Sequence, residues 1–331
     1  MAHLVYFTTI VVISSLISSS ESTCTSQFWD KNIIVSRNGQ DREGCLSVNA
    51  GVPCATLGYV LRGLQNKSKL DHTLINVDYD HDLASPLYIS GVCDLAIVGG
   101  NDPILNCSRG SGIAFSNSIN ILVEGVAWEG CSISHYTTSL DSSTSATLNA
   151  TSSIVFYRCI NVTISSCRFT SEWGAGVSMY DVGGTINITE TEFVDLVTPR
   201  QCLVRNDSSN TNCILLGGGL SITLTQCGNF STCEAASSSE YNSFSTYMIT
   251  RCLFSNNTDM NLEDCEVNLH GNALSLSILG ASIENTYIIS ENMFEHNVYS
   301  CMKAYDSSAT VHAISSIRLG SDAINNKPGQ V

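Results

Sequence analysis

The sequence predicts an all-β fold, a parallel β-helix in which short strands stack coil upon coil behind an N-terminal capping helix. One observation is a nine-residue pattern that occurs five times, with apolar residues at its second and fourth positions. Another is a shorter run of small and apolar residues that precedes each copy. Apolar residues at every second position are typical of strands. Units repeated at intervals of about 20–50 residues are typical of solenoids, in which each unit packs on its neighbours.

The nine-residue pattern predicts one bent pair of strands. Its second, fourth, seventh and ninth positions would face the interior, and its small or polar fifth and sixth positions would form the bend. The ninth position is aromatic in every copy, so stacked copies predict a ladder of aromatic rings. The copies occupy residues 120–128, 161–169, 185–193, 246–254 and 286–294.

The short run of small and apolar residues before each copy of the pattern is predicted to form a third strand in each coil. Its copies begin at residues 112, 153, 176, 218 and 272, and the shortest interval between them is 23 residues. The longer intervals predict surface loops at 132–152, 228–245 and 255–271, where binding specificity would lie. Two other kinds of repeat do not fit. Leucine-rich repeats need regular Leu and Asn positions that this chain lacks, and helical repeats need apolar residues with a period of 3.6, which these patterns do not have.

Residues 1–20 are predicted to be a secretory signal peptide. They carry no charged side chain, are largely apolar and end in small residues, although no Lys or Arg precedes the apolar stretch. The alternative is a buried first strand. No other segment offers 18 consecutive apolar residues, so no membrane span is predicted. We therefore expect an extracellular, secreted chain.

Residues 21–70 are predicted to hold an N-terminal strand, at 32–36, and the capping helix, at 55–65. The apolar stripe of this helix would cover the open end of the first coil, where strand edges and core would otherwise be exposed. The stripe consists of Leu57, Val60, Leu61 and Leu64.

Residues 71–331 are predicted to form the coils and their surface loops, and to end in a truncation. The segment 316–331 begins another strand without a capping element, and the cysteine count of 15 is odd. The alternative is a short natural tail with one free cysteine.

Cysteines and glycosylation sequons both agree with an oxidising, glycosylating route. The pairs predicted as local disulfides are Cys45 with Cys54, Cys202 with Cys213, and Cys227 with Cys233. Cys167 and Cys252 occupy the seventh position of the pattern, which is predicted to face inward. They are expected to be either buried thiols or disulfide links to neighbouring coils. No C-x₂-C motif occurs, so zinc is not expected. Eight N-x-[ST] sequons are predicted glycan acceptors, namely Asn66, Asn106, Asn149, Asn161, Asn187, Asn206, Asn229 and Asn256. Two of these, Asn161 and Asn187, are predicted to face outward.

The run NIIVSRNGQDREGCLSVNAGVPCATLGYVL resembles the entry of secreted right-handed parallel β-helix proteins of the pectin-lyase-like superfamily. In those proteins a VS-x-x-G-x-D strand and turn precede a PC-x-TL capping helix. The segments CINVTISSCRF and GGTINITETEF resemble their coils, and the resemblance covers residues 30–320. It implies a right-handed solenoid like that of poorly characterised extracellular animal proteins. It implies little about chemistry, because the superfamily holds lyases, hydrolases, esterases and non-catalytic binders.

The enzymes of this superfamily have motifs that can be sought directly. The hydrolases resemble one another in an Asp-Asp pair, a Gly-His-Gly and an Arg-x-Lys, and none of these occurs here. The lyases use a calcium site of several carboxylates and an Arg base. The nearest candidate for calcium is Asp78, Asp80 and Asp82, whose carboxylates alternate along the chain; an exposed acidic turn is the favoured interpretation. Glu190 and Glu192 are likewise interpreted as a solvated turn.

Charge limits the choice of partner. The formal net charge of −15 and the pI near 4.7 disfavour nucleic acid, anionic membranes and polyuronates. We therefore expect no cofactor and no catalytic residues, but a secreted, glycosylated module for recognition, adhesion or structure that binds a neutral glycan or a matrix protein. The alternative is a carbohydrate-active enzyme, either a polysaccharide lyase or a glycoside hydrolase.

Overall fold

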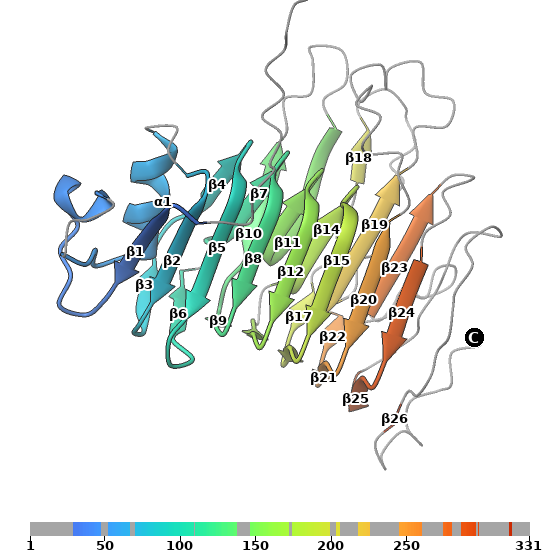
Figure 1. The fold of residues 1–331 in the computed structure, drawn as a ribbon. Helices are drawn as coiled ribbons and strands as arrows, with labels where there is room; N and C mark the ends of the chain where they lie inside the picture. Colours follow the sequence, from blue (N-terminus) through green and yellow to red (C-terminus); the bar gives the residue numbers. More distant parts are fainter. Residues whose placement is uncertain are drawn as a thin grey trace, which may run out of the picture.

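The computed structural model describes residues 29–297, with gaps at 48–51, 67–69, 109, 138–145, 172–173, 199–202, 206–217, 226–244, 260–273, 280–285 and 296, together with residues 318–319. The predicted signal peptide and most of the second and third predicted loops lie outside this part of the chain. The described part is predominantly β-structure, arranged in three long sheets that run side by side (Figure 1).

Sheet A and sheet B each contain eight parallel strands. Sheet A has the order β1 (Lys31–Val35), β2 (Thr73–Val77), β5 (Cys93–Gly99), β8 (Ile119–Glu124), β12 (Ile160–Ser165), β15 (Gly183–Thr189), β20 (Thr246–Thr250), β24 (Thr286–Ser290). Sheet B has the order β3 (His81–Leu83), β6 (Ile104–Cys107), β9 (Ala127–Glu129), β13 (Arg168–Thr170), β16 (Glu192–Val194), β21 (Leu253–Ser255), β25 (Met293–Glu295), β26 (Arg318–Leu319).

Sheet C is parallel along its main path and takes the strands from the short preceding run. Its order is β4 (Leu87–Ser90), β7 (Ile113–Ser116), β11 (Ala146–Tyr157), β14 (Ala175–Tyr180), β19 (Leu220–Thr225), β23 (Leu274–Leu279). From β2 to β25 the chain passes through sheets A, B and C in that order, so that each round adds one strand to the main path of each sheet. A separate pair, β17 (Val197–Thr198) and β22 (Thr258–Asp259), is also parallel.

The predicted register of the nine-residue pattern is confirmed. Val162 in β12 pairs with Ile121 on one side and with Ile186 on the other, and these three side chains are buried. The fifth and sixth positions form the corner between sheets A and B. The sixth position has a left-handed backbone at Gly125, Ser166, Glu190, Arg251 and Glu291. Such a conformation turns the chain sharply within one residue.

The predicted aromatic ladder lies in the core along sheet B. Phe169 stacks on Trp128 with ring centroids 6.2 Å apart and on Phe193 at 5.4 Å. The stack continues through Phe254 to Phe294, at 4.9 Å for each step. Offset or stacked rings at such distances add to the stabilisation that burial alone provides.

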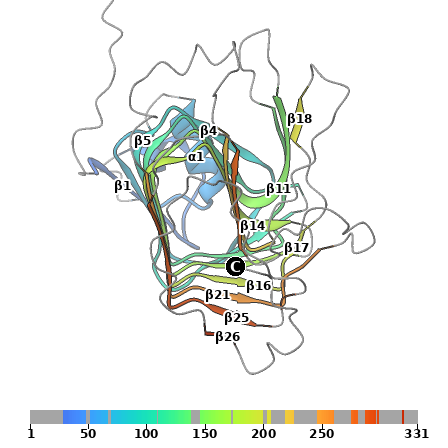
Figure 2. The same ribbon diagram turned by 90° about the vertical axis from the view of Figure 1, so that its right-hand side faces the viewer.

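Helix α1 (Leu57–Gln65) lies at the end where the chain enters the sheets, and Figure 2 views this arrangement along the stack. The four residues of its predicted stripe are buried. Thr56 is its N-cap and accepts a hydrogen bond from the Tyr59 amide. The Asp41 carboxylate accepts from the amides of Ala55 and Thr56 and thereby fixes the approach to the helix. A short 3₁₀ helix, η1 (Glu43–Leu46), precedes it.

The predicted loop at 132–152 is wrong in part, because it contains two strands. The strand β10 (Ile133–Thr137) pairs with the first half of β11 in antiparallel fashion. On the other side of β11, the strand β18 (Leu203–Arg205) pairs with it, also antiparallel. Figure 2 shows β11 and β18 rising beyond the outline of the three sheets. The high Ser and Thr content that suggested a loop is equally compatible with strands.

Two disulfides join described cysteines. Cys45 and Cys54 are bonded beside α1, and Cys107 and Cys131 link neighbouring coils. The second pair was not predicted from the sequence, because its 24-residue separation shows no local signal. The predicted pairs Cys202–Cys213 and Cys227–Cys233 lie outside the described residues.

Cys159, Cys167 and Cys252 are buried free thiols. Burial raises the pKa of Cys159 and of Cys167 to about 12, and that of Cys252 to about 11. The thiolate is the reactive form, and at pH 8 about one such thiol in a thousand or fewer would be ionised. We expect all three to resist iodoacetamide in the native protein and to react in denaturant, as read by peptide mapping. Rapid alkylation of any of them in the folded chain would contradict this.

Candidate functional site

Four residues with left-handed backbones lie on successive coils at the start of sheet A. His72, Asp94, Asn120 and Asn161 have φ values of 53–57°. Strand register aligns them, because Leu95 pairs with Ile121 and Ile121 with Val162, each one residue further on. Asn, Asp and His adopt this conformation more readily than most other residues. We call these four residues the polar ladder.

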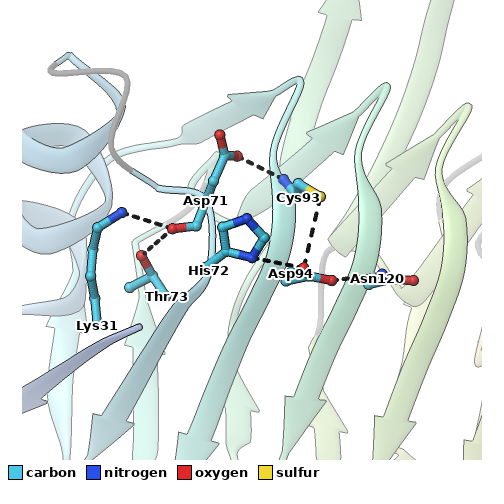
Figure 3. A network of polar contacts seen from close by, with 7 residues as sticks. All are labelled: Lys31, Asp71, His72, Thr73, Cys93, Asp94 and Asn120. Atoms are coloured by element: carbon cyan, nitrogen blue, oxygen red, sulfur yellow. Dashed lines mark hydrogen bonds and ion pairs between the residues drawn. The ribbon is translucent and has the colours of Figure 1, made fainter. Parts of the chain in front are cut away.

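The side chains of the polar ladder are joined from coil to coil. His72 Nδ1 lies 2.8 Å from the Asp94 Oδ2 atom, and Asn120 Nδ2 donates to Asp94 Oδ1 at 2.6 Å. Asn161 Nδ2 then donates to Asn120 Oδ1 at 2.9 Å, and the Thr185 amide of the next coil donates to Asn161 Oδ1 at 2.9 Å. The ladder therefore satisfies polar groups across four successive coil boundaries (Figure 3 shows its first three members).

The N-terminal end of the ladder is held by backbone contacts. Lys31 Nζ donates to the Asp71 carbonyl oxygen at 2.8 Å, and the Asp71 carboxylate accepts from the Cys93 amide at 2.8 Å (Figure 3). The Asp94 side chain is 3% exposed, and its two carboxylate oxygens contact His72 and Asn120, as a buried polar group requires.

His72, Cys93 and Asp94 are also the one group of potential metal ligands within the described residues. One ligand atom from each lies within 4.8 Å of the others. The Cys93 sulfur, however, belongs to a disulfide and offers no thiolate. The Asp94 carboxylate is already bound by His72 and Asn120. The donor set therefore does not fit a metal ion, and its chemistry is that of a structural hydrogen-bond network.

The candidate calcium residues are spread over the turn that leads into β3. Asp78, Asp80 and Asp82 are all exposed, and they do not form a cluster of converging ligands. Asp80 Oδ1 instead accepts a hydrogen bond from the Ile104 amide of the next coil at 2.8 Å. The geometry agrees with the exposed acidic turn that the sequence favoured.

His81 lies between two of these aspartates, and its imidazole holds the start of α1. The Leu57 amide donates to His81 Nε2 at 3.2 Å, and His81 Nδ1 lies 3.0 Å from the Tyr79 carbonyl oxygen. This arrangement needs a neutral ring with its proton on Nδ1. Burial lowers the pKa of His81, and the nearby carboxylates of Asp82, Asp41 and Asp80 oppose that shift.

The lowered pKa of His81 predicts a loss of stability in acid. Between about pH 6.5 and the lower native pKa, the unfolded chain takes up a proton that the folded chain does not, so the free energy of unfolding falls as the pH falls. His81→Gln places an acceptor oxygen near the position of Nε2 for the Leu57 amide and removes this titration. We expect urea unfolding of the variant to depend less steeply on pH from 6.5 to 4.5. Parallel pH profiles for the two proteins would contradict the assignment.

Glu190 and Glu192 pair with arginines of adjacent coils. Arg251 Nη1 lies 2.9 Å from Glu190 Oε1, and Arg168 Nε lies 3.7 Å from Glu192 Oε2. All four side chains are about half exposed, so each pair contributes on the order of 0–1 kcal/mol. The two carboxylates belong to separate surface ion pairs.

The structure separates the predicted sequons by exposure. Asn66, Asn106 and Asn256 are exposed, and Asn187 is half-buried on the outer side of sheet A. Asn161, which was also predicted to face outward, is half-buried like Asn187, and its amide is bound within the polar ladder. Asn149 lies in β11, and Asn206 and Asn229 lie outside the described residues.

The polar ladder was not predicted, although the sequence holds a signal for it. Asp94, Asn120 and Asn161 each precede an apolar residue that starts an alternating strand, and Asn120 and Asn161 share the first position of the nine-residue pattern. An Asn or Asp that recurs at one position of a solenoid repeat marks a stacked side chain.

Comparison with known proteins found no matching family model, no similar curated protein and no similar solved structure. Across the described part of the chain, α1 is too short to cross a bilayer and no other helix is long and apolar enough to do so.

Proposed function

We propose that the three sheets are the faces of a right-handed parallel β-helix of the pectin-lyase-like type, capped at its N-terminal end by α1. The rotation of the chain through sheets A, B and C supports this, because one strand is added to each sheet in every round. The buried stripe of α1 and its contacts with β4 and η1 support the capping role.

We infer that the protein is a secreted, glycosylated and non-catalytic module for recognition, adhesion or structure. The observation that carries this proposal is the use made of its buried ionisable groups. Asp94 contacts His72 and Asn120, and His81 accepts from the Leu57 amide. A general acid or base must instead lie within hydrogen-bond reach of a substrate.

The outer faces provide the binding surface in this proposal. On sheet A, outward residues on successive strands align in straight rows, as Leu122, Thr163 and Asn187 do. Neighbouring strands lie about 4.8 Å apart, so such a row presents similar contacts at regular steps. This suits an extended or repetitive partner. The acidic net charge favours a neutral glycan or a matrix protein over a polyanion.

Binding and hydrolysis can be tested on the same secreted, purified chain. Arrays of neutral glycans and matrix proteins should reveal a ligand, while assays for new reducing ends and for unsaturated products, with and without Ca²⁺, should stay at background. A polysaccharide that is depolymerised, with no ligand bound, would replace the proposal by its enzymatic alternative.

The alternative is a polysaccharide lyase or glycoside hydrolase, and the acidic turn is where it would be tested. Asp80→Ala should abolish a Ca²⁺-dependent activity if this turn binds the metal. Glu124→Ala serves as the control, because Glu124 is an exposed carboxylate at the end of β8 and lies outside this turn. Equal binding of matrix ligands by both variants and the parent would support the non-catalytic proposal.

A further inference from the structure

Three sequon asparagines with well-described surroundings differ in what their side chains already do. Asn106, Asn161 and Asn187 each begin an N-x-[ST] sequon. We propose that Asn106 and Asn187 carry N-linked glycans in the secreted protein, whereas Asn161 stays unmodified because its amide is part of the polar ladder. The proposal rests on the proposed function, since N-glycans are added only to chains that enter the secretory pathway.

Asn161 and Asn187 form a matched comparison. They lie on the adjacent strands β12 and β15, both are half-buried, and both are followed by an apolar residue and a Thr. Asn187 pairs in register with Thr163, the third residue of the Asn161 sequon, on the outer side of sheet A. The two sequons therefore share sequence type and lie on neighbouring strands, and they differ in the backbone conformation and the contacts of the asparagine, since Asn161 has a left-handed backbone.

Both polar atoms of the Asn161 side-chain amide make hydrogen bonds. Its Nδ2 atom, to which a glycan would be attached, donates to Asn120 Oδ1 at 2.9 Å, and its Oδ1 atom accepts from the Thr185 amide at 2.9 Å. The adjacent Gly184 packs against that oxygen so closely that a Cβ atom at Gly184 would clash with it. A sugar on Nδ2 would remove one N–H group and add a pyranose ring at an atom already in contact with Asn120.

Glycans are attached before folding is complete, so the contacts of Asn161 do not prevent the attachment itself. They act afterwards, when a modified chain folds. A chain modified at Asn161 would have to fold with a single N–H left on Nδ2 and with a pyranose ring placed beside Asn120. Buried polar groups without partners are costly, and such chains would be depleted from the secreted fraction. Secreted protein is therefore the material to examine.

Asn106 and Asn187 have no such restraint. Asn106 is exposed on the outer side of sheet B, between Asp82 and Glu129 on the neighbouring strands. Asn187 points away from the core between buried Ile186 and Ile188. Neither side-chain amide takes part in a hydrogen bond of the structure, so a glycan on either nitrogen displaces no contact.

The test is site-specific occupancy in the full chain secreted from a eukaryotic cell. Enzymatic deglycosylation in H₂¹⁸O converts each occupied asparagine to labelled aspartate, which peptide mass spectrometry detects. We expect label at Asn106 and Asn187 and none at Asn161. Label at Asn161, or its absence from Asn106 or Asn187 while other sequons are labelled, would overturn the proposal. Absence of the chain from the medium would overturn the proposed secretion, whereas secreted chain with no label at any sequon would overturn this inference alone.

Single substitutions separate a structural asparagine from a glycan acceptor. Asn106→Gln and Asn187→Gln should each reduce the mass of the secreted protein by one glycan. Thr163→Ala removes the sequon of Asn161 and leaves the Asn161 amide intact, so it should change neither the glycan mass of the secreted protein nor its Tm. Asn161→Ala should lower the Tm at unchanged glycan mass. Loss of one glycan in Thr163→Ala would show that Asn161 is an acceptor and would overturn the proposal.

Discussion

Replacing Phe169 by Ala is expected to lower the free energy of unfolding by about 3–5 kcal/mol, through lost transfer energy and the cavity left behind. Phe169 is fully buried and stacks between Trp128 and Phe193. The backbone of sheet B is fixed by its neighbours on both sides, so the site cannot collapse to fill the gap. Urea unfolding followed by circular dichroism measures the loss.

Arg168→Ala is the matched control for this substitution. Arg168 adjoins Phe169 but is about half exposed, and its contact with Glu192 at 3.7 Å is a surface ion pair. Its removal should change the free energy of unfolding by about 0.5 kcal/mol or less. Hydrogen exchange should locate the damage from Phe169→Ala on the adjacent coils, because each coil contacts only its neighbours. Small, equal effects of the two substitutions would refute the stacking as described.

Removing the disulfide beside α1 is expected to cost about 2–3 kcal/mol. Cys45 and Cys54 close a loop of nine residues' separation, and the bond restricts the unfolded chain by a corresponding loss of entropy. The double variant Cys45→Ala, Cys54→Ala avoids leaving a single free thiol. Its free energy of unfolding should fall by this amount, and amide exchange in α1 should accelerate before exchange in sheet C does.

Arg42→Ala controls for local disturbance of the same segment. Arg42 is exposed immediately before η1, and its side chain makes no assigned contact. It should leave the stability within about 0.5 kcal/mol of the parent. If the double cysteine variant were as stable as Arg42→Ala, the disulfide would not hold the N-terminal segment against the first coil.

Periodicity made the strands of the coils predictable. The second and fourth positions of the pattern, such as Val162 and Ile164, are buried and pair in register with their counterparts. The stack of rings was predictable from the aromatic ninth position, because a large apolar residue that recurs at one place in each repeat is expected to be buried in the core. The buried apolar stripe of α1 was also predictable from periodicity, because its residues recur at helical spacing.

Contacts that depend on the third dimension were less predictable. The bond between Cys107 and Cys131 joins neighbouring coils, and the composition of β10 and β11 does not specify their antiparallel pairing. The site was the weakest part of the sequence analysis. Asn161 matched a modification motif, and nothing in that motif reveals whether the amide will be bound to Asn120 in the folded chain.

The polar ladder allows coils of different lengths to keep a common alignment. Its steps from Asp94 to Asn120 and from Asn120 to Asn161 cross 26 and 41 residues of chain, yet both are closed by the same contact, an asparagine Nδ2 that donates to the Oδ1 atom of the preceding member. A slip by one residue would put an apolar side chain where an amide is needed. The longest step contains the antiparallel pair of β10 and the first half of β11, and the ladder contact is the same before and after it. The fold can therefore gain or lose surface segments between its rungs while the spacing of its faces stays constant.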